Sequence, residues 1–569
     1  MPRYALPPPP ARPILAAVVA LWGLAFGCNA DLAFERGAGA FCDGPGACPE
    51  GLYCDPDALR CEPLRAEGEP CTAPQQCSEG LCVHGYCCDG PCNQACLSCG
   101  LVGSLGRCSA VPEGIDPEDQ CPGTAVCSDV ARCQGTHLWS RRIGSPDEER
   151  ATKVAVAPDG VVVVTGSFEG SLTIGTDELE SEGGRDVFVA AFDEGPAGPA
   201  PIWAVAFGST GDDEPMDLVV DSLGRSVVVG RFEAPMTVVD KALFAVDTDA
   251  FVVRLAADGQ SAATVFALSG LGVQVATSVA LDEDDAVVVG GVYDQEIRYE
   301  PTDTVPSAGG TDAFIARLEA TGEVVWHREL GDAQDQRCEA LGVAPGGDVI
   351  AALGGRGAVD TGGGSITGSL EDDDLFLVRL DASSGAGGPV LLFGGQGEQS
   401  ATAIAVDDQS EIWLAGRFTR ELLVPGGPTL VGGEDVDGFY TKLSANSTHL
   451  ASAALSGPFD DEPIDLTIDV EGNAIIVGRF ELQLVIGETE ATIDANGSAD
   501  LFLLKLDATA EPLWTQPYGG LLADRAVSVA TADNGDVIAI GDFEASIAFS
   551  ESSLQAAGAT DLFIAKFAR

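Results

Sequence analysis

The chain has 569 residues, of which 88 are acidic and 30 are basic, and its formal net charge at pH 7 is −58. This charge would repel the phosphate backbone of DNA or RNA, so it excludes a nucleic-acid-binding surface and disfavours contact with anionic membranes. The hydrophobic content of 45% excludes general disorder, and the 71 glycines favour an all-β protein of short strands and tight turns.

Residues 1–28 have the form of an export signal. Arg3 and Arg12 supply positive charge around the start of the apolar run Ile14–Phe26, whose 13 residues are too few to cross a bilayer as a helix. The run ends in LAFGC, which resembles the end of a bacterial lipoprotein signal and implies a lipid on Cys28. We therefore expect a lipid-anchored protein at the outer membrane or cell surface of a Gram-negative bacterium. The competing interpretation is ordinary cleavage near Ala30, which would give a secreted or periplasmic protein.

A linker at residues 29–41 leads to a cysteine-rich module at residues 42–133. The module has too few large apolar residues for an ordinary core, and export implies an oxidising compartment, so we expect disulfides to supply most of its stability. Their connectivity cannot be read from the spacing and stays open. The 16 cysteines of the module are Cys42, Cys48, Cys54, Cys61, Cys71, Cys77, Cys82, Cys87, Cys88, Cys92, Cys96, Cys99, Cys108, Cys121, Cys127 and Cys133.

Two alternatives concern individual cysteines. The spacing between Cys96 and Cys99 is half of a zinc ribbon, but the other half is missing and His84 is the only histidine of the module, so zinc is disfavoured. If Cys28 carries lipid, Cys338 is left as a buried free thiol; otherwise a bridge between these two is formally open. We favour the free thiol.

After the module, one strand recurs seven times. Each copy begins with Asp, carries Phe at its third place and alternates two faces as a β-strand does. Successive copies begin 63, 63, 62, 63, 63 and 61 residues apart, which indicates repeated structural units. The copies are DVFVAAF at Asp186, DAFVVRL at Asp249, DAFIARL at Asp312, DLFLVRL at Asp374, DGFYTKL at Asp437, DLFLLKL at Asp500 and DLFIAKF at Asp561.

The sixth place of this strand is basic in six copies, with Ala191 as the exception. Such regular repetition is typical of a structural ion pair or a solvated sheet face rather than of a binding site. The six residues are Arg254, Arg317, Arg379, Lys442, Lys505 and Lys566.

Three further strands keep step with the first. Each repeat contains a segment such as ATAIAVDD, an apolar run such as SVVVGRF, and a last strand such as IWAVAFG. The last type occurs once before the first repeat, at Leu138–Gly144, and does not follow the final one. A ring whose first strand completes its last blade needs this offset. We therefore predict an all-β fold: a seven-bladed β-propeller of four-stranded blades at residues 138–569, preceded by the small disulfide-rich module.

With its recurring G-x-F, D-x-F and W-x-x-x-x-G motifs, the region 138–569 resembles the bacterial β-propeller-repeat family. The resemblance implies a propeller in a secreted or surface protein, often of unknown ligand. In the third and fourth blades, Tyr293 and Arg356 stand near the expected aromatic residue. We expect these two blades to be less regular.

Motifs for catalysis are missing from the sequence. It contains four histidines and no G-x-S-x-G, H-E-x-x-H or P-loop motif. His327 follows Trp326 in an outer strand, where we favour a partly exposed structural role over that of a general base. We therefore expect no enzymatic activity. The acidic composition keeps one alternative open, an envelope enzyme that acts as a carboxylate-based hydrolase or lyase on polysaccharide or protein.

The leading hypothesis is a monomeric, envelope-anchored binding or interaction protein, whose propeller loops meet an unknown protein or glycan ligand. The loops that join each outer strand to the next inner strand are acidic in six of seven cases. Solvated turns explain these carboxylates, and the sharper hypothesis is that they bind a divalent cation such as Ca²⁺, or a cationic ligand. The candidate residues are Asp147, Asp212, Asp213, Asp332, Asp460, Asp461 and Asp524.

Overall fold

The computed structural model describes residues 134–569 except 196–197, 301, 488–491 and 550–551. Before residue 134 it describes residues 38, 40, 42, 48–50, 52–56, 58–78, 80–89, 92, 96–101, 104–111 and 127. The expected signal, the lipidation at Cys28, and Cys121 and Cys133 lie outside these residues. No helix in the described part is long and apolar enough to cross a membrane.

The chain forms two compact units, Met1–Pro91 with Val102–Arg107, and Cys92–Leu101 with Cys108–Arg569. Short hairpins and disulfides build the cysteine-rich segments of both, as expected, because each bridge restricts the unfolded chain. The hairpins are β1 (Leu52–Asp55) with β2 (Arg60–Pro63), β3 (Cys82–Val83) with β4 (Tyr86–Cys87) and β5 (Leu97–Ser98) with β6 (Ser109–Ala110), and a 3-10 turn spans Pro74–Gln76. Bridges join Cys42 to Cys54, Cys48 to Cys61, Cys71 to Cys82, Cys77 to Cys87, Cys92 to Cys108 and Cys96 to Cys127, and Cys88 and Cys99 are disulfide-bonded as well.

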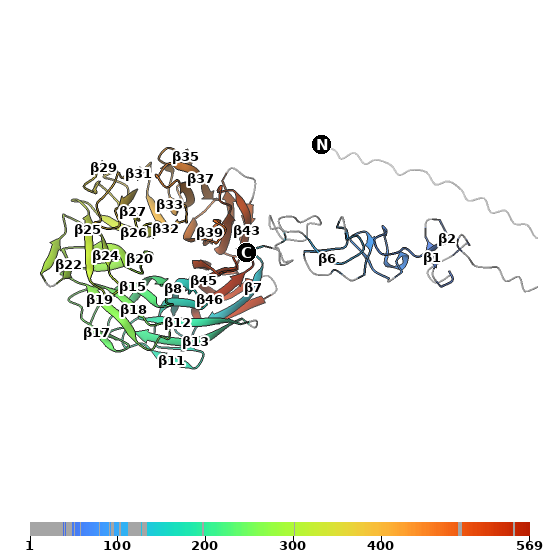
Figure 1. The fold of residues 1–569 in the computed structure, drawn as a ribbon, viewed down its shortest axis with the longest axis horizontal. Helices are drawn as coiled ribbons and strands as arrows, with labels where there is room; N and C mark the ends of the chain where they lie inside the picture. Colours follow the sequence, from blue (N-terminus) through green and yellow to red (C-terminus); the bar gives the residue numbers. More distant parts are fainter. Residues whose placement is uncertain are drawn as a thin grey trace, which may run out of the picture. The chain divides into compact units, whose positions relative to one another are not determined.

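The second unit contains a seven-bladed β-propeller, which confirms the predicted fold (Figure 1). Each blade is an antiparallel sheet whose four core strands follow chain order from the channel outward, and blade 7 borrows its outer strand from the start of the ring. Blades 1 to 3 are β8 (Glu149–Val156), β9 (Val162–Phe168), β12 (Asp186–Gly195), β13 (Gly198–Phe207); β14 (Glu214–Val220), β15 (Ser226–Phe232), β18 (Asp249–Leu255), β19 (Ala262–Leu268); and β20 (Gln274–Leu281), β21 (Val287–Tyr293), β24 (Asp312–Leu318), β25 (Val324–Leu330). Blades 4 to 7 are β26 (Gln336–Val343), β27 (Val349–Gly355), β30 (Asp374–Leu380), β31 (Leu391–Phe393); β32 (Gln399–Val406), β33 (Ile412–Phe418), β36 (Asp437–Leu443), β37 (His449–Ser456); β38 (Asp461–Ile468), β39 (Ala474–Phe480), β42 (Asp500–Leu506), β43 (Pro512–Tyr518); and β44 (Asp524–Thr531), β45 (Val537–Phe549), β46 (Ser552–Phe567), β7 (His137–Ile143).

The ring closes as predicted, because β7 pairs with the C-terminal strand β46. Ile143 lies opposite Leu562, and Trp139 lies opposite Lys566. The borrowed strand gives blade 7 the same four strands as the other blades and covers an edge that would otherwise be exposed.

The glycine of the G-x-F motif leaves room for the phenylalanine ring of the D-x-F motif. Gly166 on β9 lies opposite Phe188 on β12, and a Cβ atom at Gly166 would approach the Phe188 ring to 2.7 Å. Blade 3 keeps this geometry and is regular, contrary to our expectation, because the Tyr293 ring packs edge-on against Phe314 at 6.5 Å. Blade 4 is irregular as expected: Leu353 takes the place of the glycine, and its outer strand has three residues.

Small hairpins between the second and third strands form a feature that we did not predict. In blades 3, 5 and 6 they bridge to the end of the outer strand of the preceding blade, for example through the pairing of β40 with β37. The hairpins are β10 (Ser171–Ile174) with β11 (Asp177–Glu180), β16 (Met236–Val238) with β17 (Lys241–Leu243), β22 (Glu296–Glu300) with β23 (Asp303–Pro306), β28 (Ala358–Asp360) with β29 (Ser365–Thr367), β34 (Glu421–Leu423) with β35 (Thr429–Val431), and β40 (Gln483–Ile486) with β41 (Thr492–Asp494). In blade 7 the extended ends of β45 and β46 take this role.

The antiparallel order gives the propeller two distinct faces. Loops from each fourth strand to the next first strand emerge at the same end of the sheets as the hairpins, and we call this side the rim face. The tight turns between first and second strands, and between third and fourth strands, emerge on the opposite side, which we call the turn face.

Candidate functional site

The repeated Asp of the D-x-F strand has a structural role. Asp186 accepts a hydrogen bond from the backbone N–H of Glu182 at 2.9 Å, and Asp437 accepts one from Gly433 at 2.7 Å. Each carboxylate thereby fixes the end of the hairpin segment that precedes it. A Cβ atom at Gly208 would approach the Asp186 carboxylate to 2.2 Å, so the glycine that ends the outer strand leaves room for this buried group.

The basic residue at the sixth place forms the predicted structural ion pair. It reaches a carboxylate at the turn between the first and second strands of its own blade. Arg317 lies 2.6 Å from Asp282, and Lys505 lies 2.8 Å from Asp469. These contacts stabilise the turns of this face, and each of the six basic residues is engaged by a carboxylate.

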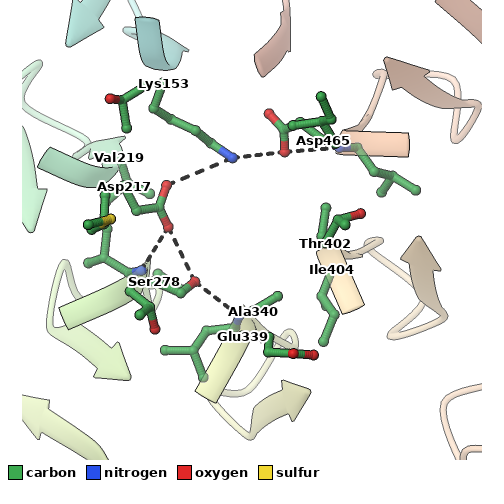
Figure 2. A pocket seen from close by; sticks show the side chains of 18 of the residues that line it. Lys153, Asp217, Val219, Ser278, Glu339, Ala340, Thr402, Ile404 and Asp465 are labelled. Atoms are coloured by element: carbon green, nitrogen blue, oxygen red, sulfur yellow. Dashed lines mark hydrogen bonds and ion pairs between the residues drawn. The ribbon is translucent and has the colours of Figure 1, made fainter. Parts of the chain in front are cut away.

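A cluster of polar side chains spans the central channel, where the first strands of the blades meet (Figure 2). The ammonium group of Lys153, from blade 1, lies 2.8 Å from Asp465 of blade 6 and 3.8 Å from Asp217 of blade 2. Burial works against the charge of Lys153, but the two carboxylates outweigh it and raise the pKa of the ammonium group. Burial raises the pKa of Asp217, although Lys153 opposes that shift. Lys153 therefore stays charged and ties three blades together.

The two aspartates also join neighbouring blades. Asp217 accepts bonds from the N–H of Val279 at 2.8 Å and from Ser278 at 3.2 Å, both in blade 3. Asp465 makes the same pair of contacts with Val529 and Ser528 of blade 7. Each lies next to a bulge that recurs in every first strand and re-aims its side chain. Their repetition reflects a role in ring assembly.

The channel contains a cavity of about 510 Å³. Its polar groups are concentrated on one side, because Ala340 and Ala403 of blades 4 and 5 occupy the positions held elsewhere by Lys153, Asp217, Ser278, Asp465 and Ser528. Glu339, next to Ala340 in blade 4, is a polar residue on the other side of the cavity, and burial raises its pKa to about 7. Glu339 already accepts a bond from the Ala401 N–H at 2.7 Å and pairs with Arg337 at 2.8 Å. Its contacts are accordingly structural.

Three of the predicted rim residues are buried. Asp213, Asp461 and Asp524 occupy equivalent positions at the starts of first strands, and each is at most 1% exposed. Asp524 accepts a bond from the Gly520 N–H at 2.6 Å, which closes the loop before it. Burial raises the pKa of Asp461 to about 8 and that of Asp524 to about 7.

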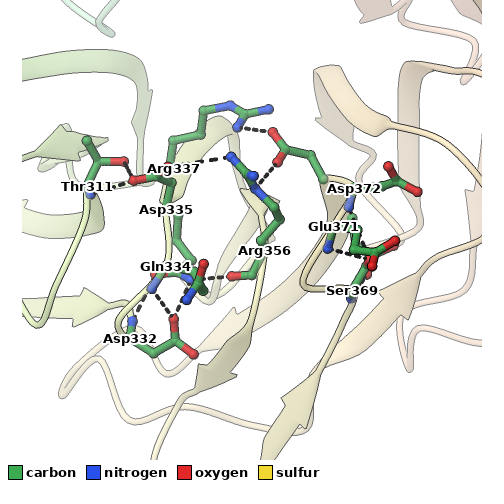
Figure 3. A network of polar contacts seen from close by, with 12 residues as sticks. Thr311, Asp332, Gln334, Asp335, Arg337, Arg356, Ser369, Glu371 and Asp372 are labelled. Atoms are coloured by element: carbon green, nitrogen blue, oxygen red, sulfur yellow. Dashed lines mark hydrogen bonds and ion pairs between the residues drawn. The ribbon is translucent and has the colours of Figure 1, made fainter.

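Two more predicted residues tie adjacent rim loops together. Asp212 accepts a bond from the Arg185 N–H at 3.1 Å, and Asp460 accepts one from the Val436 N–H at 3.0 Å. In blade 4 the same role falls to Asp335, which binds the Thr311 N–H at 3.0 Å (Figure 3).

The remaining two predicted residues differ in setting. Asp332 accepts bonds from the N–H groups of Gln334 and Ala358, both at 2.8 Å, and its pKa is lowered by these bonds despite some burial. Asp147 is exposed. Among the described residues, no three of these carboxylates bring oxygen atoms within 4.8 Å of one another. The calcium hypothesis therefore stays a prediction.

Arginines on the rim face were missed by the sequence reasoning. They pair with other carboxylates of this face: Arg231 pairs with Glu214 at 2.9 Å, and Arg479 lies 3.1 Å from Glu462. Around blade 4, Arg337 and Arg356 converge on Asp373 at 2.8 and 3.0 Å (Figure 3). The recurring tripeptide GRF, which carries Arg231, Arg417 and Arg479, was the signal that could have revealed them.

His327 is structural, as favoured from the sequence. Its ring stacks on Tyr299 at 4.0 Å and lies between Glu329 at 2.7 Å and Asp303 at 2.9 Å. Hydrogen bonding to Glu329 raises its pKa. Cys338 is a buried free thiol, in agreement with our preference, and burial raises its pKa.

No protein-family model matches the chain. It is 25% identical over 308 residues to the regulatory protein FlaEY of Caulobacter vibrioides, a match that covers 53% of this chain and 26% of that protein. It is 20% identical to an uncharacterized WD repeat-containing protein of Acanthamoeba polyphaga mimivirus, with 76% of this chain and 38% of that protein covered. The chain thus spans well under half the length of either relative.

Among solved structures, the chain is similar to the WD40 propeller domain of Doa1, with a TM-score of 0.38, 10% identity, and coverage of 76% of this chain and 97% of that one. It is also similar to a catalytically inactive virginiamycin B lyase from Staphylococcus aureus, with a TM-score of 0.37, 8% identity, and coverage of 76% and 99%. The strand pairing itself establishes the fold, and these likenesses say nothing of function.

Proposed function

We propose that the protein is an exported, envelope-anchored binding protein that presents the rim face of its propeller to an extracellular or periplasmic ligand. The 14 disulfide-bonded cysteines among the described residues suit an oxidising compartment. A rigid ring that carries loops of different sequence on one face is a suitable scaffold for recognition.

Exposed apolar side chains on the rim face carry this proposal. Phe244 is 71% exposed and Leu521 is 81% exposed, although both belong to loops of a strongly charged protein. Leu271 is also exposed and lies on the loop beside that of Phe244, since the two loops are joined by a bridge between Thr248 and Val273. The rim loops carry such residues in groups, as Phe244 with Val246, Leu271 with Val273, and Leu521 with Leu522, whereas Leu223 and Val470 stand singly on turns of the opposite face. Grouped apolar side chains exposed within a charged surface mark sites of interaction.

Variants on the two faces provide the test. Phe244→Ser with Leu521→Ser removes apolar groups from the rim face, and Leu223→Ser with Val470→Ser removes equally exposed ones from turns on the opposite face. The full-length protein is cross-linked in its own cell envelope, and the amount of partner cross-linked to it is measured. We expect this amount to fall at least tenfold in the first variant only. Equal losses in both variants, or no loss in either, would contradict the proposal.

The anchor is tested separately at Cys28. Intact-mass measurement of the mature protein should show an N-terminal Cys28 with acyl mass, and Cys28→Ser should move the protein from the detergent phase to the aqueous phase. A mature N-terminus at Asp31 without acyl mass would instead establish secretion.

A further inference from the structure

A second cavity, of about 320 Å³, lies on the rim face where blades 6, 7 and 1 meet. Two small residues in its lining, Ala499 and Ala523, leave space for this cavity, and their backbones are joined by a bridge. In other blades a carboxylate occupies the position of Ala523, for example Asp460, which contacts the Val436 N–H. Because Ala523 leaves that position empty, the wall between neighbouring loops opens into a pocket.

Three guanidinium groups from three blades line this pocket: Arg150, Arg479 and Arg525. Two of them are fixed by paired bonds through Nε and Nη2. Arg150 binds Glu148 at 3.2 and 2.9 Å, and Arg525 binds Asp542 at 3.0 and 2.8 Å.

The carboxylate of Asp542 is itself held by the backbone. It accepts a bond from the Ala151 N–H of the next blade at 2.8 Å. Arg525 and Asp542 are thus oriented before any ligand arrives, which lowers the entropic cost of binding. Arg150 and Arg525 nevertheless remain about half exposed, at 46% and 48%, so a ligand can reach them.

The charge balance selects the class of ligand. Three guanidinium groups stand against the carboxylates of Glu148, Asp542, Glu544 and the buried Asp524, so the lining has no cationic excess that would favour a simple anion. Each arginine already has a carboxylate partner, and the lining therefore offers donors and acceptors side by side. Vicinal hydroxyl groups match this pattern, since each hydroxyl accepts from a guanidinium group and donates to a carboxylate.

We propose that this pocket binds one sugar residue of a glycan through its hydroxyl groups. The volume lies at the low end of the range for small-ligand pockets, roughly 300–1,000 Å³, and so suits a single sugar unit. The neighbouring Leu521 and Leu522 are exposed on the same loop as Ala523 and offer an apolar surface to the rest of the chain of sugars. The proposal rests on the rim face being the binding face, and it assigns the ligand class of that face.

Ala523→Asp is the most selective variant. It restores the rim carboxylate found in other blades and fills the pocket without removing any contact. The matched control is Arg231→Ala, which alters a guanidinium group at the position equivalent to Arg479 in blade 2, outside the pocket. Arg525→Gln provides a second variant that keeps a donor for Asp542.

The probes are glucose, galactose, glucuronate and inorganic sulfate, titrated by calorimetry and by saturation-transfer NMR into the full-length protein. We expect at least one of the sugars to bind, at least tenfold weaker in Ala523→Asp and Arg525→Gln, and unchanged in Arg231→Ala. Binding of sulfate without any sugar, sugar binding that Ala523→Asp leaves unchanged, or no binding at all would overturn the proposal. If sugars fail to bind while the Phe244 and Leu521 substitutions still abolish cross-linking, only this inference falls.

Discussion

The two faces of the propeller differ in how they vary from blade to blade. On the turn face, the pairing of a basic residue with a turn carboxylate recurs in six blades, from Arg254 with Asp221 to Lys566 with Asp536. On the rim face, acidic, basic and small residues exchange positions: Asp212, Val273 and Ala523 occupy one repeat position in three blades. Uniform positions maintain the ring, and variable positions are free to recognise a ligand.

Both faces exist only when the ring is closed, so opening the ring should have the largest effect on the stability of the propeller. Deletion of His137–Ile143 removes β7 and leaves β46 as an exposed edge, so we expect a lower melting temperature by more than 10 °C and a loss of cooperativity. Deletion of residues 29–91 removes most of the first unit and should change the melting temperature of the propeller little. Thermal unfolding followed by circular dichroism checks both, and equal melting temperatures would rule out closure by β7.

The turn face should be sensitive to loss of a single charge. Lys505 and Asp469 are almost fully buried, with side chains 4% and 1% exposed, so Lys505→Ala would leave an unpaired carboxylate in the interior. We expect a loss of about 3–5 kcal/mol in the free energy of unfolding. The rim-face pair Arg420 with Glu434 is exposed, and Arg420→Ala should cost about 0–1 kcal/mol. Denaturant titration compares the two variants. A similar loss of stability in both would show that ion pairs of the turn face contribute no more than those of the rim face.

On the rim face, pH should reveal the cost of a buried carboxyl group. Burial raises the pKa of Asp461 from 3.8 to about 8, with repulsion by Asp437, Asp435 and Asp460 acting in the same direction. The folded state therefore holds a proton that the unfolded state releases, so this group lowers stability as pH rises from about 4 to about 8.

Asp461→Asn should abolish this dependence, and the free energy of unfolding of the variant should exceed that of the wild type more at pH 8 than at pH 5. The control is Asp258→Asn at an exposed turn of blade 2, which does not act on Asp461 and should leave the slope unchanged. The midpoints of urea unfolding, measured across this pH range, give the pH dependence of stability for the wild type and both variants. A slope that is the same in Asp461→Asn and the wild type would show that Asp461 is ionised throughout.

The repeat could be predicted from sequence because its signals are local. The G-x-F and D-x-F motifs reflect one steric contact, that of Gly166 with Phe188 and its equivalents, and the spare strand at Leu138–Gly144 predicted the closure. The channel could not be predicted, because Lys153 and Asp465 lie 312 positions apart in the chain and meet only after the ring has closed. The pocket at Ala523 depends in the same way on three blades being adjacent.

The burial of Asp461 was missed although the sequence contained a clue. The equivalent positions in blades 3, 4 and 5 are Gln274, Gln336 and Gln399. Exchange of Asp with the neutral Gln at one repeat position indicates a buried polar group that does not need a charge, because buried polar side chains serve hydrogen bonding. The acidic loops alone did not distinguish these two roles.

Calcium should have only a small effect on the rim. The candidate carboxylates are tied to backbone N–H groups and do not converge, so we expect a dissociation constant of about 10⁻⁴–10⁻³ M, as in weak extracellular sites. At 10 mM Ca²⁺ this would raise the free energy of unfolding by about 1–3 kcal/mol. The gain should disappear in a variant with Asn at positions 212, 213, 460 and 461, because Asn still accepts the backbone hydrogen bonds but carries no charge. Calorimetric titration of the full-length protein measures the binding, and sodium chloride at equal ionic strength serves as control. An identical response to calcium and to sodium would mean that the rim carboxylates only fix the loops, so that recognition on this face would depend on its apolar side chains and on the pocket at Ala523.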